Sequence, residues 1–319
     1  MNIVFFGSSH FAVPSLKALL SCGHKISCVV TQPDKKKGRG LSLSATVIKE
    51  LAKGLNLKIY QPENINIPEA RKFLKGLNPD LFVVIAYGQI LSSAILSIPK
   101  AFSINLHASL LPKYRGAAPI NWALIKGEKI TGITVMKMTE EMDAGPIIQQ
   151  KEIEINNDDT SITLEDKLSH FAAQLLLTSL HSIEDNNYNL VPQDENNVSF
   201  APKLKKEDGR IDWNKPACDI YNLIRGCISW PGAFTYYKGK LLKIYKARVS
   251  SCVHEFLSSV AGKIISVSKE GIVVATGKDN LIIEELQIEG KRRMKAGEFI
   301  AGHKISPGDS LGYPPPLSI

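Results

Sequence analysis

Short apolar runs alternate with helical patterns over the first two hundred residues, and this alternation sets the expected fold. Runs such as LFVVIA at 81–86 are apolar at every position, which is typical of strands buried on both faces of a parallel sheet. Pro14 suits the first turn of a helix, and Gly23 suits a helix end. The expected strands are 3–6, 26–30, 57–60, 81–86, 103–107, 132–138 and 147–155. The expected helices are 13–20, 45–52, 69–77, 90–96 and 161–183. The pattern predicts a doubly wound α/β domain with a mostly parallel sheet.

The pattern of apolar and polar residues changes after residue 183. The stretch EDNNYNLVPQDENN is polar and lacks periodicity, which is typical of a linker. One helical segment at 217–227 follows, and then strand-like runs at 241–249, 262–267, 271–275 and 281–286, separated by turns such as KGK and GKDN. We expect a first domain at 1–189, a linker at 190–205, and a second domain at 206–319 that forms a small OB-like β-barrel.

Composition narrows the class of protein. Hydrophobic residues make up 44% and charged residues 22% of the 319 positions, which excludes a disordered or fibrous chain. No apolar run approaches the ~20 residues that span a bilayer, and the N-terminus does not resemble a secretory signal. Five cysteines form no CxxC pair, so we expect unpaired thiols that fill small spaces in the core of a cytoplasmic protein.

The chain carries a formal net charge of +8, which permits a polyanionic partner without proving one. Residues 1–189 contribute +3 and residues 190–319 contribute +5. Two clusters concentrate this charge. One comprises Lys35, Lys36, Lys37 and Arg39 within an expected loop at 34–43, and the other Lys291, Arg292, Arg293 and Lys295.

Several common site types are missing from the sequence. The first strand–helix turn, GSSHFA, has one glycine and not the GxGxxG of dinucleotide-binding folds. There is no GxxxxGK[ST] phosphate loop, and neither HExxH nor a Cys/His cluster indicates a metal site. Ligands of open α/β sheets nevertheless bind at the carboxyl ends of the strands, so the chemistry is expected there.

The strand at 103–107 ends with Asn105 and His107 on the same face, because side chains alternate along a strand. An amide can donate to a developing oxyanion, and an imidazole can move a proton near neutral pH. Asp143 follows in a turn before Gly145 and would set the imidazole tautomer if the two met in space. A packed strand histidine and a local Asx cap are the structural alternatives for His107 and Asp143.

These motifs together resemble a known family. The string INLHASLLPKYRGAAPINWAL, followed by ITGITVM and MDAGPI, closely resembles formyltransferases that use 10-formyltetrahydrofolate. TQPD with its GRG loop, AYGQIL, RIDW and WPGAFT extend the similarity over essentially the whole chain, which more closely resembles the members that act on methionyl-tRNA. The resemblance implies a Rossmann-like domain followed by an OB-like barrel, and transfer of a formyl group to initiator methionyl-tRNA for translation initiation.

The resemblance also implies residue roles. Asn105, His107 and Asp143 match the family's catalytic residues, and no metal is required. The folate-binding positions that it implies are Ser109, Leu110, Leu111, Pro112, Tyr87, Gly88, Gln89, Ile90 and Leu91. Arg39 corresponds to the basic residue of a loop that enters the tRNA acceptor stem. The tRNA-binding positions are Lys35, Lys36, Lys37, Arg39, Lys291, Arg292 and Arg293. We expect a monomer.

Alternatives remain at this level. The basic clusters have an alternative interpretation as solvated surface charge. Another formyltransferase or a 10-formyltetrahydrofolate hydrolase would share the same catalytic residues. A protein of a different class, an OB-type nucleic-acid-binding module joined to an inactive α/β domain, would also explain the basic charge.

Overall fold

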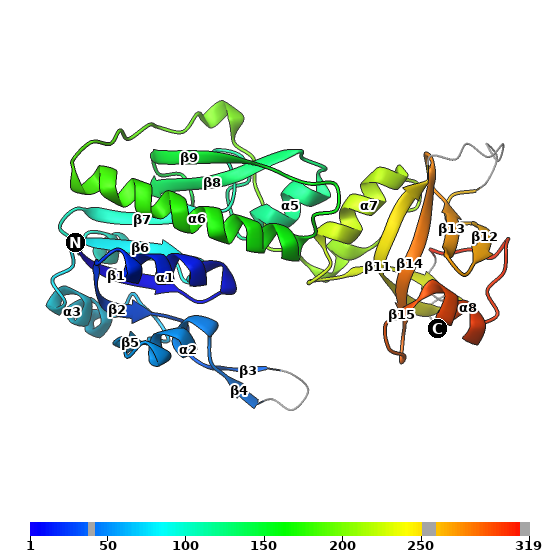
Figure 1. Ribbon diagram of the computed structural model, residues 1–319, viewed down its shortest axis with the longest axis horizontal. Coiled ribbons are helices and arrows are strands. Elements are labelled where there is room, and N and C mark those ends of the chain that lie inside the picture. The colour runs from blue at the N-terminus through cyan, green and yellow to red at the C-terminus, as the bar shows by residue number, and fades with distance from the viewer. Residues whose placement is uncertain (38–41, 251–259, 313–319) are drawn as a thin grey trace. The chain divides into compact units, whose positions relative to one another are not determined.

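The computed structural model describes residues 1–37, 42–250 and 260–312 of the chain. These residues form two compact units (Figure 1). The first unit comprises Met1–Pro119, Ile130–Ile155 and Leu164–Pro202, and the second comprises Ile120–Lys129, Asn156–Thr163 and the residues from Lys203 onward. Each unit is described by itself below.

A seven-stranded sheet forms the centre of the first unit, in the order β5-β2-β1-β6-β7-β8-β9. The strands are β1 (Asn2–Gly7), β2 (Lys25–Val30), β5 (Ile59–Tyr60), β6 (Leu81–Ile85), β7 (Phe102–His107), β8 (Ile130–Lys137) and β9 (Ile147–Glu154). Strands β5, β2, β1, β6 and β7 are parallel, whereas β8 pairs antiparallel with both β7 and β9. The predicted mostly parallel, Rossmann-like sheet is therefore confirmed, and its parallel strands bring the ends of β1, β6 and β7 to one edge.

Helices cover both faces of this sheet. They are α1 (Val13–Ser21), α2 (Val47–Gly54), α3 (Pro68–Gly76), α4 (Ser93–Leu96) and α6 (Ser161–Glu184), whose first turn belongs to the second unit. Figure 1 shows α1 and α6 crossing one face of the sheet. On the other face, Leu74 of α3 and Ile95 of α4 share a core with Phe6 of β1 and Phe82 of β6. At the start of α2, the Thr46 side chain accepts a hydrogen bond from the Lys49 N–H, as an N-cap does.

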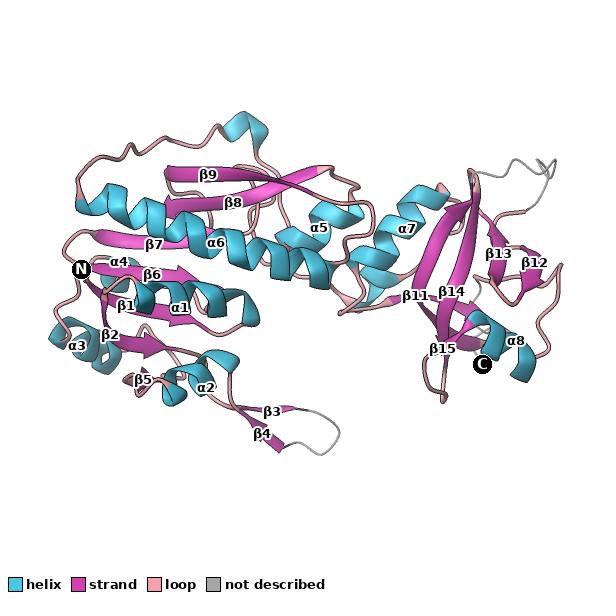
Figure 2. Cartoon of the chain, in the orientation of Figure 1, coloured by secondary structure: helices cyan, strands magenta, loops and turns pink. Residues whose placement is uncertain are grey.

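The second unit is built on an antiparallel sheet, which Figure 2 distinguishes from its helices by colour. The strands are β10 (Ala233–Tyr237), β11 (Lys240–Ser250), β12 (Ile264–Ser268), β13 (Gly271–Ala275), β14 (Asn280–Ile288) and β15 (Met294–Lys295). The helices are α5 (Pro119–Ile125), which begins at the boundary between the units, α7 (Ala217–Gly226) and α8 (Ala296–Gly302). Ile220 of α7 and Phe299 of α8 lie in one core with the inward-facing residues of the sheet.

The expected OB-like barrel is not confirmed. The sheet order is β10-β11-β14-β13-β12, with β15 paired to β14, and in the described chain its edge strands β10 and β12 do not pair with each other. Isolated bridges join these edges to other segments, Phe234 of β10 to Arg210, Tyr237 of β10 to Leu311, and Lys263, just before β12, to Ser310. The second domain is thus an antiparallel sheet that strand pairing does not close.

The expected loop at 34–43 is partly a wrong prediction. Backbone pairing joins β3 (Lys35–Lys37) to β4 (Ser42–Ser44) as an antiparallel ribbon. Lysine and serine are not enriched in strands, so local composition does not predict this pairing. Arg39 lies outside the described residues.

The cysteines divide into two kinds. Cys28 and Cys227 are buried, and burial raises the pKa of both thiols to about 12, as expected of inert core residues. Cys22 and Cys218 are exposed, which corrects the expectation that the cysteines fill the core. Cys252 lies outside the described residues.

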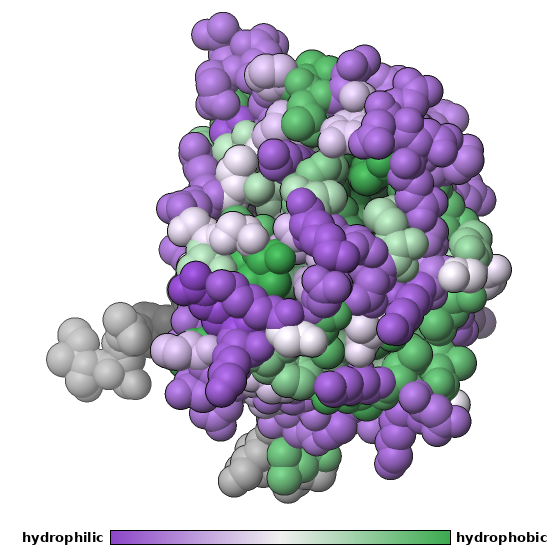
Figure 3. All heavy atoms as spheres, turned by 90° about the vertical axis from the view of Figure 1, so that its left-hand side faces the viewer, coloured by the Kyte–Doolittle hydropathy of each residue, from purple (hydrophilic) through white to green (hydrophobic). Residues whose placement is uncertain are grey.

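The face of the molecule in Figure 3 is mainly hydrophilic, with hydrophobic side chains scattered between polar ones. Such scattered apolar surface is normal for a folded protein. Among the described helices, none combines the length and the apolar character that crossing a bilayer requires.

Candidate active site

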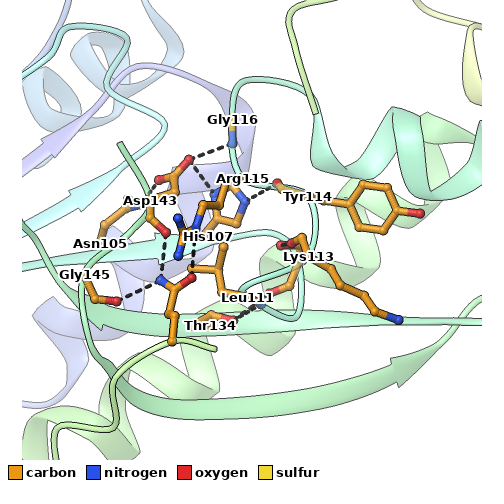
Figure 4. A network of polar contacts seen from close by, with 12 residues as sticks. Asn105, His107, Leu111, Lys113, Tyr114, Arg115, Gly116, Thr134, Asp143 and Gly145 are labelled. Atoms are coloured by element: carbon orange, nitrogen blue, oxygen red, sulfur yellow. Dashed lines mark hydrogen bonds and ion pairs between the residues drawn. The ribbon is translucent and has the colours of Figure 1, made fainter. Parts of the chain in front are cut away.

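Asn105 and His107 lie at the carboxyl end of β7, where strand alternation places them on one face. The His107 side chain is 7% exposed, and its Nε2 lies 2.9 Å from the carbonyl oxygen of Tyr114. A carbonyl oxygen only accepts, so this contact makes Nε2 a donor and leaves Nδ1 directed at Asp143 Oδ2, 3.6 Å away. The predicted meeting of His107 and Asp143 is present in the structure (Figure 4).

Asp143 lies in the β8–β9 connection, and its carboxylate faces three partners. Oδ2 accepts the backbone N–H of Gly116 at 2.9 Å and faces His107, while Oδ1 accepts Asn105 Nδ2 at 3.3 Å. The Asp143 side chain is 11% exposed. The turn also needs Gly145, because a Cβ at that position would lie 1.8 Å from the Lys137 carbonyl oxygen. The end of β7, the loop that follows it and the β8–β9 connection therefore meet at one carboxylate.

The segment 109–112, predicted to bind folate, is hydrogen-bonded to side chains of the antiparallel strands β8 and β9. Ser109 Oγ donates to the Lys113 carbonyl at 2.6 Å, and Thr134 Oγ1 donates to the Ser109 carbonyl at 2.7 Å. Thr134 also accepts the Leu111 N–H at 3.1 Å, and Leu111 is buried. Leu110 and Pro112 are partly exposed. The backbone of this segment is thus fixed at the end of β7.

The second predicted folate segment, 87–91, follows β6, the strand next to β7. Gln89 fixes it by accepting the Ile65 N–H at 2.9 Å and donating to the Pro62 carbonyl at 3.2 Å. Tyr87 and Leu91 are buried, and Ile90 is 66% exposed. Gly88 has φ +87°, a conformation that favours glycine. Since β6 and β7 are adjacent and parallel, both predicted folate segments lie at the same edge of the sheet.

A cavity of about 630 Å³ opens at this edge, beside the ends of β1, β2 and β6. Its lining includes the turn at 8–10, Gln32, the segment at 86–88 and Glu165. Within the described chain, Ser9 Oγ, Gln32 Nε2 and Tyr87 Oη are buried without a hydrogen-bond partner. Burial raises the pKa of the Glu165 carboxyl above its usual value. Polar and apolar residues thus line the cavity together.

Three further residues hold the site together and were not predicted. Arg115, 3% exposed, donates Nε to Gln193 Oε1 at 3.0 Å and faces Glu195 through Nη2 at 2.8 Å. Gln193 Nε2 donates to the carbonyl oxygens of Asp143 and Gly145, both at 2.8 Å. Gln193 and Glu195 belong to the polar stretch interpreted as a linker, and composition alone does not distinguish a packed polar segment from a solvated one.

The basic clusters lie apart from these residues in sequence and differ in their surroundings. Lys35 is exposed at the start of β3, and the backbone of Lys36 and Lys37 pairs with β4. Arg292 Nη2 lies 2.7 Å from Glu298 Oε2, and Arg293 pairs with Glu285 and stacks on the Tyr245 ring. Lys291 is exposed. In the part of the chain that the structure describes, no group of three His, Cys, Asp or Glu side chains is arranged to hold a metal ion.

Comparison with known proteins assigns the family. The formyl transferase family model matches residues 1–180, and the model of the formyl transferase C-terminal domain matches residues 203–304. The methionyl-tRNA formyltransferase of Alkaliphilus oremlandii is 46% identical over 98% of this chain and 100% of its own length. That of Thermodesulfovibrio yellowstonii is 48% identical over 96% of this chain and 97% of its own.

Solved structures give the same fold at lower identity. WlaRD, a sugar 3N-formyl transferase, superposes with a TM-score of 0.67 and 20% identity, over 92% of this chain and 99% of that chain. The N-formyltransferase from Helicobacter canadensis gives a TM-score of 0.67 and 20% identity, over 89% and 98% respectively. With both domain models matched in order and nearly half of its residues identical to the methionyl-tRNA formyltransferases above, the chain belongs to the formyl transferase family.

Proposed function

We propose that this protein transfers the formyl group of 10-formyltetrahydrofolate to the α-amino group of initiator methionyl-tRNA, producing N-formylmethionyl-tRNA and tetrahydrofolate. The observation that carries the proposal is the convergence of Asn105, His107 and Asp143 at the end of β7. The identity to methionyl-tRNA formyltransferases over nearly the whole chain supports the choice of acceptor.

The chemistry starts with a neutral amine. A free α-amine has a pKa near ~8, so part of it is uncharged at neutral pH and attacks the formyl carbon. Negative charge then develops on the formyl oxygen, where the Asn105 amide donates a hydrogen bond and a protonated His107 ring adds positive potential. The Asp143 carboxylate, directly or through a water, takes the proton that the amine loses. The carbon–N10 bond breaks as Asp143 returns that proton to N10, and the formyl group remains on the methionyl nitrogen.

The formyl donor would bind along the edge that β6 and β7 share. Residues 109–112 and 87–91 offer a rigid backbone there, because Thr134 and Gln89 hold the two segments. The cavity beside Gly88 is lined by both polar and apolar residues, which suits a molecule that carries both ring faces and hydrogen-bonding atoms. In this proposal the protein supplies orientation and proton transfer, and the folate supplies an already activated formyl group.

The basic residues would hold the tRNA. Lys35, Lys36 and Lys37 form β3, and Arg39 follows them in the sequence. Lys291, Arg292 and Arg293 directly precede β15. Cations that neutralise duplex phosphates make affinity salt-dependent, with a log–log slope of about 0.9 per phosphate. We further propose that the open antiparallel sheet of the second unit contacts the tRNA as an OB-like domain would. The protein is proposed to work as a monomer in the cytoplasm.

One assay tests the function. Purified protein is given 10-formyltetrahydrofolate and methionyl-tRNA, with free methionine and glycinamide ribonucleotide as control acceptors. Formylation of methionyl-tRNA alone is the expected result. Formylation of glycinamide ribonucleotide, or release of free formate without transfer, would instead identify another formyltransferase or a hydrolase.

A further inference from the structure

The segment 191–201 clamps two loops of the active site. At one end, Val191 and Ile147 exchange backbone hydrogen bonds of 2.8 and 2.9 Å where β9 begins. At the other end, the Arg115 N–H donates to the Ser199 carbonyl at 2.9 Å, and the Ala201 N–H donates to the Arg115 carbonyl at 2.7 Å. The loop after β7 and the β8–β9 connection are therefore tied to one stretch of chain.

Gln193 makes the central contact of this clamp. Its side chain is nine-tenths buried, and both hydrogens of its amide have an acceptor, the carbonyl oxygens of Asp143 and Gly145 at 2.8 Å each. Its Oε1 accepts Arg115 Nε at 3.0 Å, so the amide is held at both ends. A side chain with donors on one side and an acceptor on the other is what this position requires.

Gln193 contacts the backbone at a residue with an unfavourable conformation. Asp143 has φ +54°, in the left-handed region that a residue with a side chain adopts at a cost. Such a conformation persists when its surroundings fix it, and the Gln193 amide is bonded to the carbonyl of this very residue. The position of the Asp143 carboxylate between Asn105, His107 and Gly116 depends on that backbone conformation.

Arg115 supplies the other anchor. Its guanidinium is almost fully buried, and it pairs with Glu195, whose side chain is 72% exposed. Arg115 is only one residue from Gly116, whose N–H donates to the Asp143 carboxylate at 2.9 Å. The same arginine thus links the loop that contacts the carboxylate to the glutamine that fixes its backbone.

We propose that Gln193, held by Arg115, is a positioning residue that keeps the Asp143 carboxylate in its reactive place, an inference that rests on the proposed catalytic role of Asp143. The segment 191–201, which was interpreted as a linker but belongs to the first unit, is then part of the active site. Loss of this positioning lowers turnover and leaves binding of the formyl donor intact, because the folate segments at 87–91 and 109–112 are held by other residues.

The test is the substitution Gln193→Glu. The carboxylate keeps the size of the side chain and accepts from Arg115, but it has no N–H for the two carbonyls. We expect kcat, expressed per site titrated with tetrahydrofolate, to fall about 10–100-fold, with KM for the formyl donor within about twofold of wild type. Gln149→Glu, which makes the same exchange at a side chain bonded to Ser179, is the matched control and keeps wild-type turnover.

The outcomes separate the two proposals. Wild-type protein that does not formylate methionyl-tRNA overturns the proposed function and this inference with it. Active wild type together with unchanged kcat per titrated site in Gln193→Glu overturns the positioning role alone. Where Gln193→Glu does not fold, Gln193→Asn takes its place, since an amide withdrawn by about 1.5 Å no longer reaches both carbonyls. Failure of both variants to fold, or wild-type kcat per site in Gln193→Asn, also contradicts the proposal.

Discussion

Two sets of charged side chains in this protein differ in their exposure to solvent, and the difference separates residues suited to catalysis from residues suited to binding. Asp143 and His107 of the first unit are 11% and 7% exposed, and the carboxylate has three partners, two on β7 and one in the loop that follows it. Arg292 and Glu298 of the second unit are 75% and 48% exposed and form a simple pair near the surface. Both sets bring opposite charges together, but in different solvent environments.

The difference decides what each set can do. A buried, fully partnered carboxylate holds one geometry and acts in a low dielectric, where preorganised groups affect charge development most strongly. An exposed pair is screened by water and salt and contributes about 0–1 kcal/mol to stability. Arg292 can therefore exchange Glu298 for a phosphate at a small cost in free energy. The first set is therefore suited to catalysis and the second to contact with a polyanion.

The largest effect is expected when the buried imidazole of His107 is removed. We expect His107→Ala to lower kcat by about 10²–10⁴-fold, because proton transfer and charge stabilisation both depend on the ring. The measurement is kcat on methionyl-tRNA per folded molecule. His170→Ala, at an exposed position of α6, is the matched control. Near-normal turnover of His107→Ala with lowered stability would mean that His107 is only a packed strand residue.

A substitution in the Asp143 turn tests whether the geometry matters independently of the reactive groups. A Cβ added at Gly145 would meet the Lys137 carbonyl at 1.8 Å, so the turn must shift. We expect Gly145→Ala to reduce kcat about tenfold or more and to lower the free energy of unfolding by about 1–3 kcal/mol. Gly76→Ala, which meets nothing within 4 Å, serves as control in thermal unfolding. Wild-type kcat for Gly145→Ala would show that the turn tolerates displacement.

An exposed arginine should behave in the opposite way. Arg292→Ala is expected to change the free energy of unfolding by less than about 1 kcal/mol and to leave kcat unaltered. If Arg292 neutralises one phosphate, the log–log salt slope of the KM for methionyl-tRNA becomes shallower by about 0.9. Steady-state kinetics over a salt series measures this slope. An unchanged slope would leave Arg292 as surface charge paired with Glu298.

The smallest effect concerns Glu165 in the cavity wall. Burial raises the pKa of its carboxyl in the folded state, so the folded protein binds this proton more tightly than the unfolded chain. Stability therefore falls as pH rises from the unfolded pKa through the folded pKa. Glu165→Gln removes that loss, and we expect Tm at pH 7 to rise by about 1–2 °C with no gain at pH 4. An equal Tm difference at both pH values would contradict this account.

Local patterns in the sequence were sufficient for the sheet and for the ends of its strands. Alternation along β7 placed Asn105 and His107 on one face, and continuous apolar runs identified β1 and β6. The meeting of Asp143 with His107 is a long-range contact that no local pattern contains. It depends on the antiparallel pairing of β7 with β8 and on the turn at Gly145.

Other features could not be predicted because their residues have a weak or opposite preference for the secondary structure that they form. β3 consists of three lysines, and α8 contains glycines at 297 and 302, which lower helix propensity. β10 (AFTYY) lies directly after a Pro-Gly turn and was missed although its residues favour strands. Gln193 lies in a run of polar residues, and only the structure reveals that its amide is buried against the Asp143 turn.

The central claim is that the cluster of Asn105, His107 and Asp143 formylates methionyl-tRNA. The most direct measurement is the initial rate of formyl transfer from 10-formyltetrahydrofolate to methionyl-tRNA by wild type and by His107→Ala, with glycinamide ribonucleotide and free methionine as control acceptors. The account predicts transfer to methionyl-tRNA alone and a loss of about 10²–10⁴-fold in the variant. Equal rates for the two proteins, or transfer to glycinamide ribonucleotide in place of methionyl-tRNA, would contradict it.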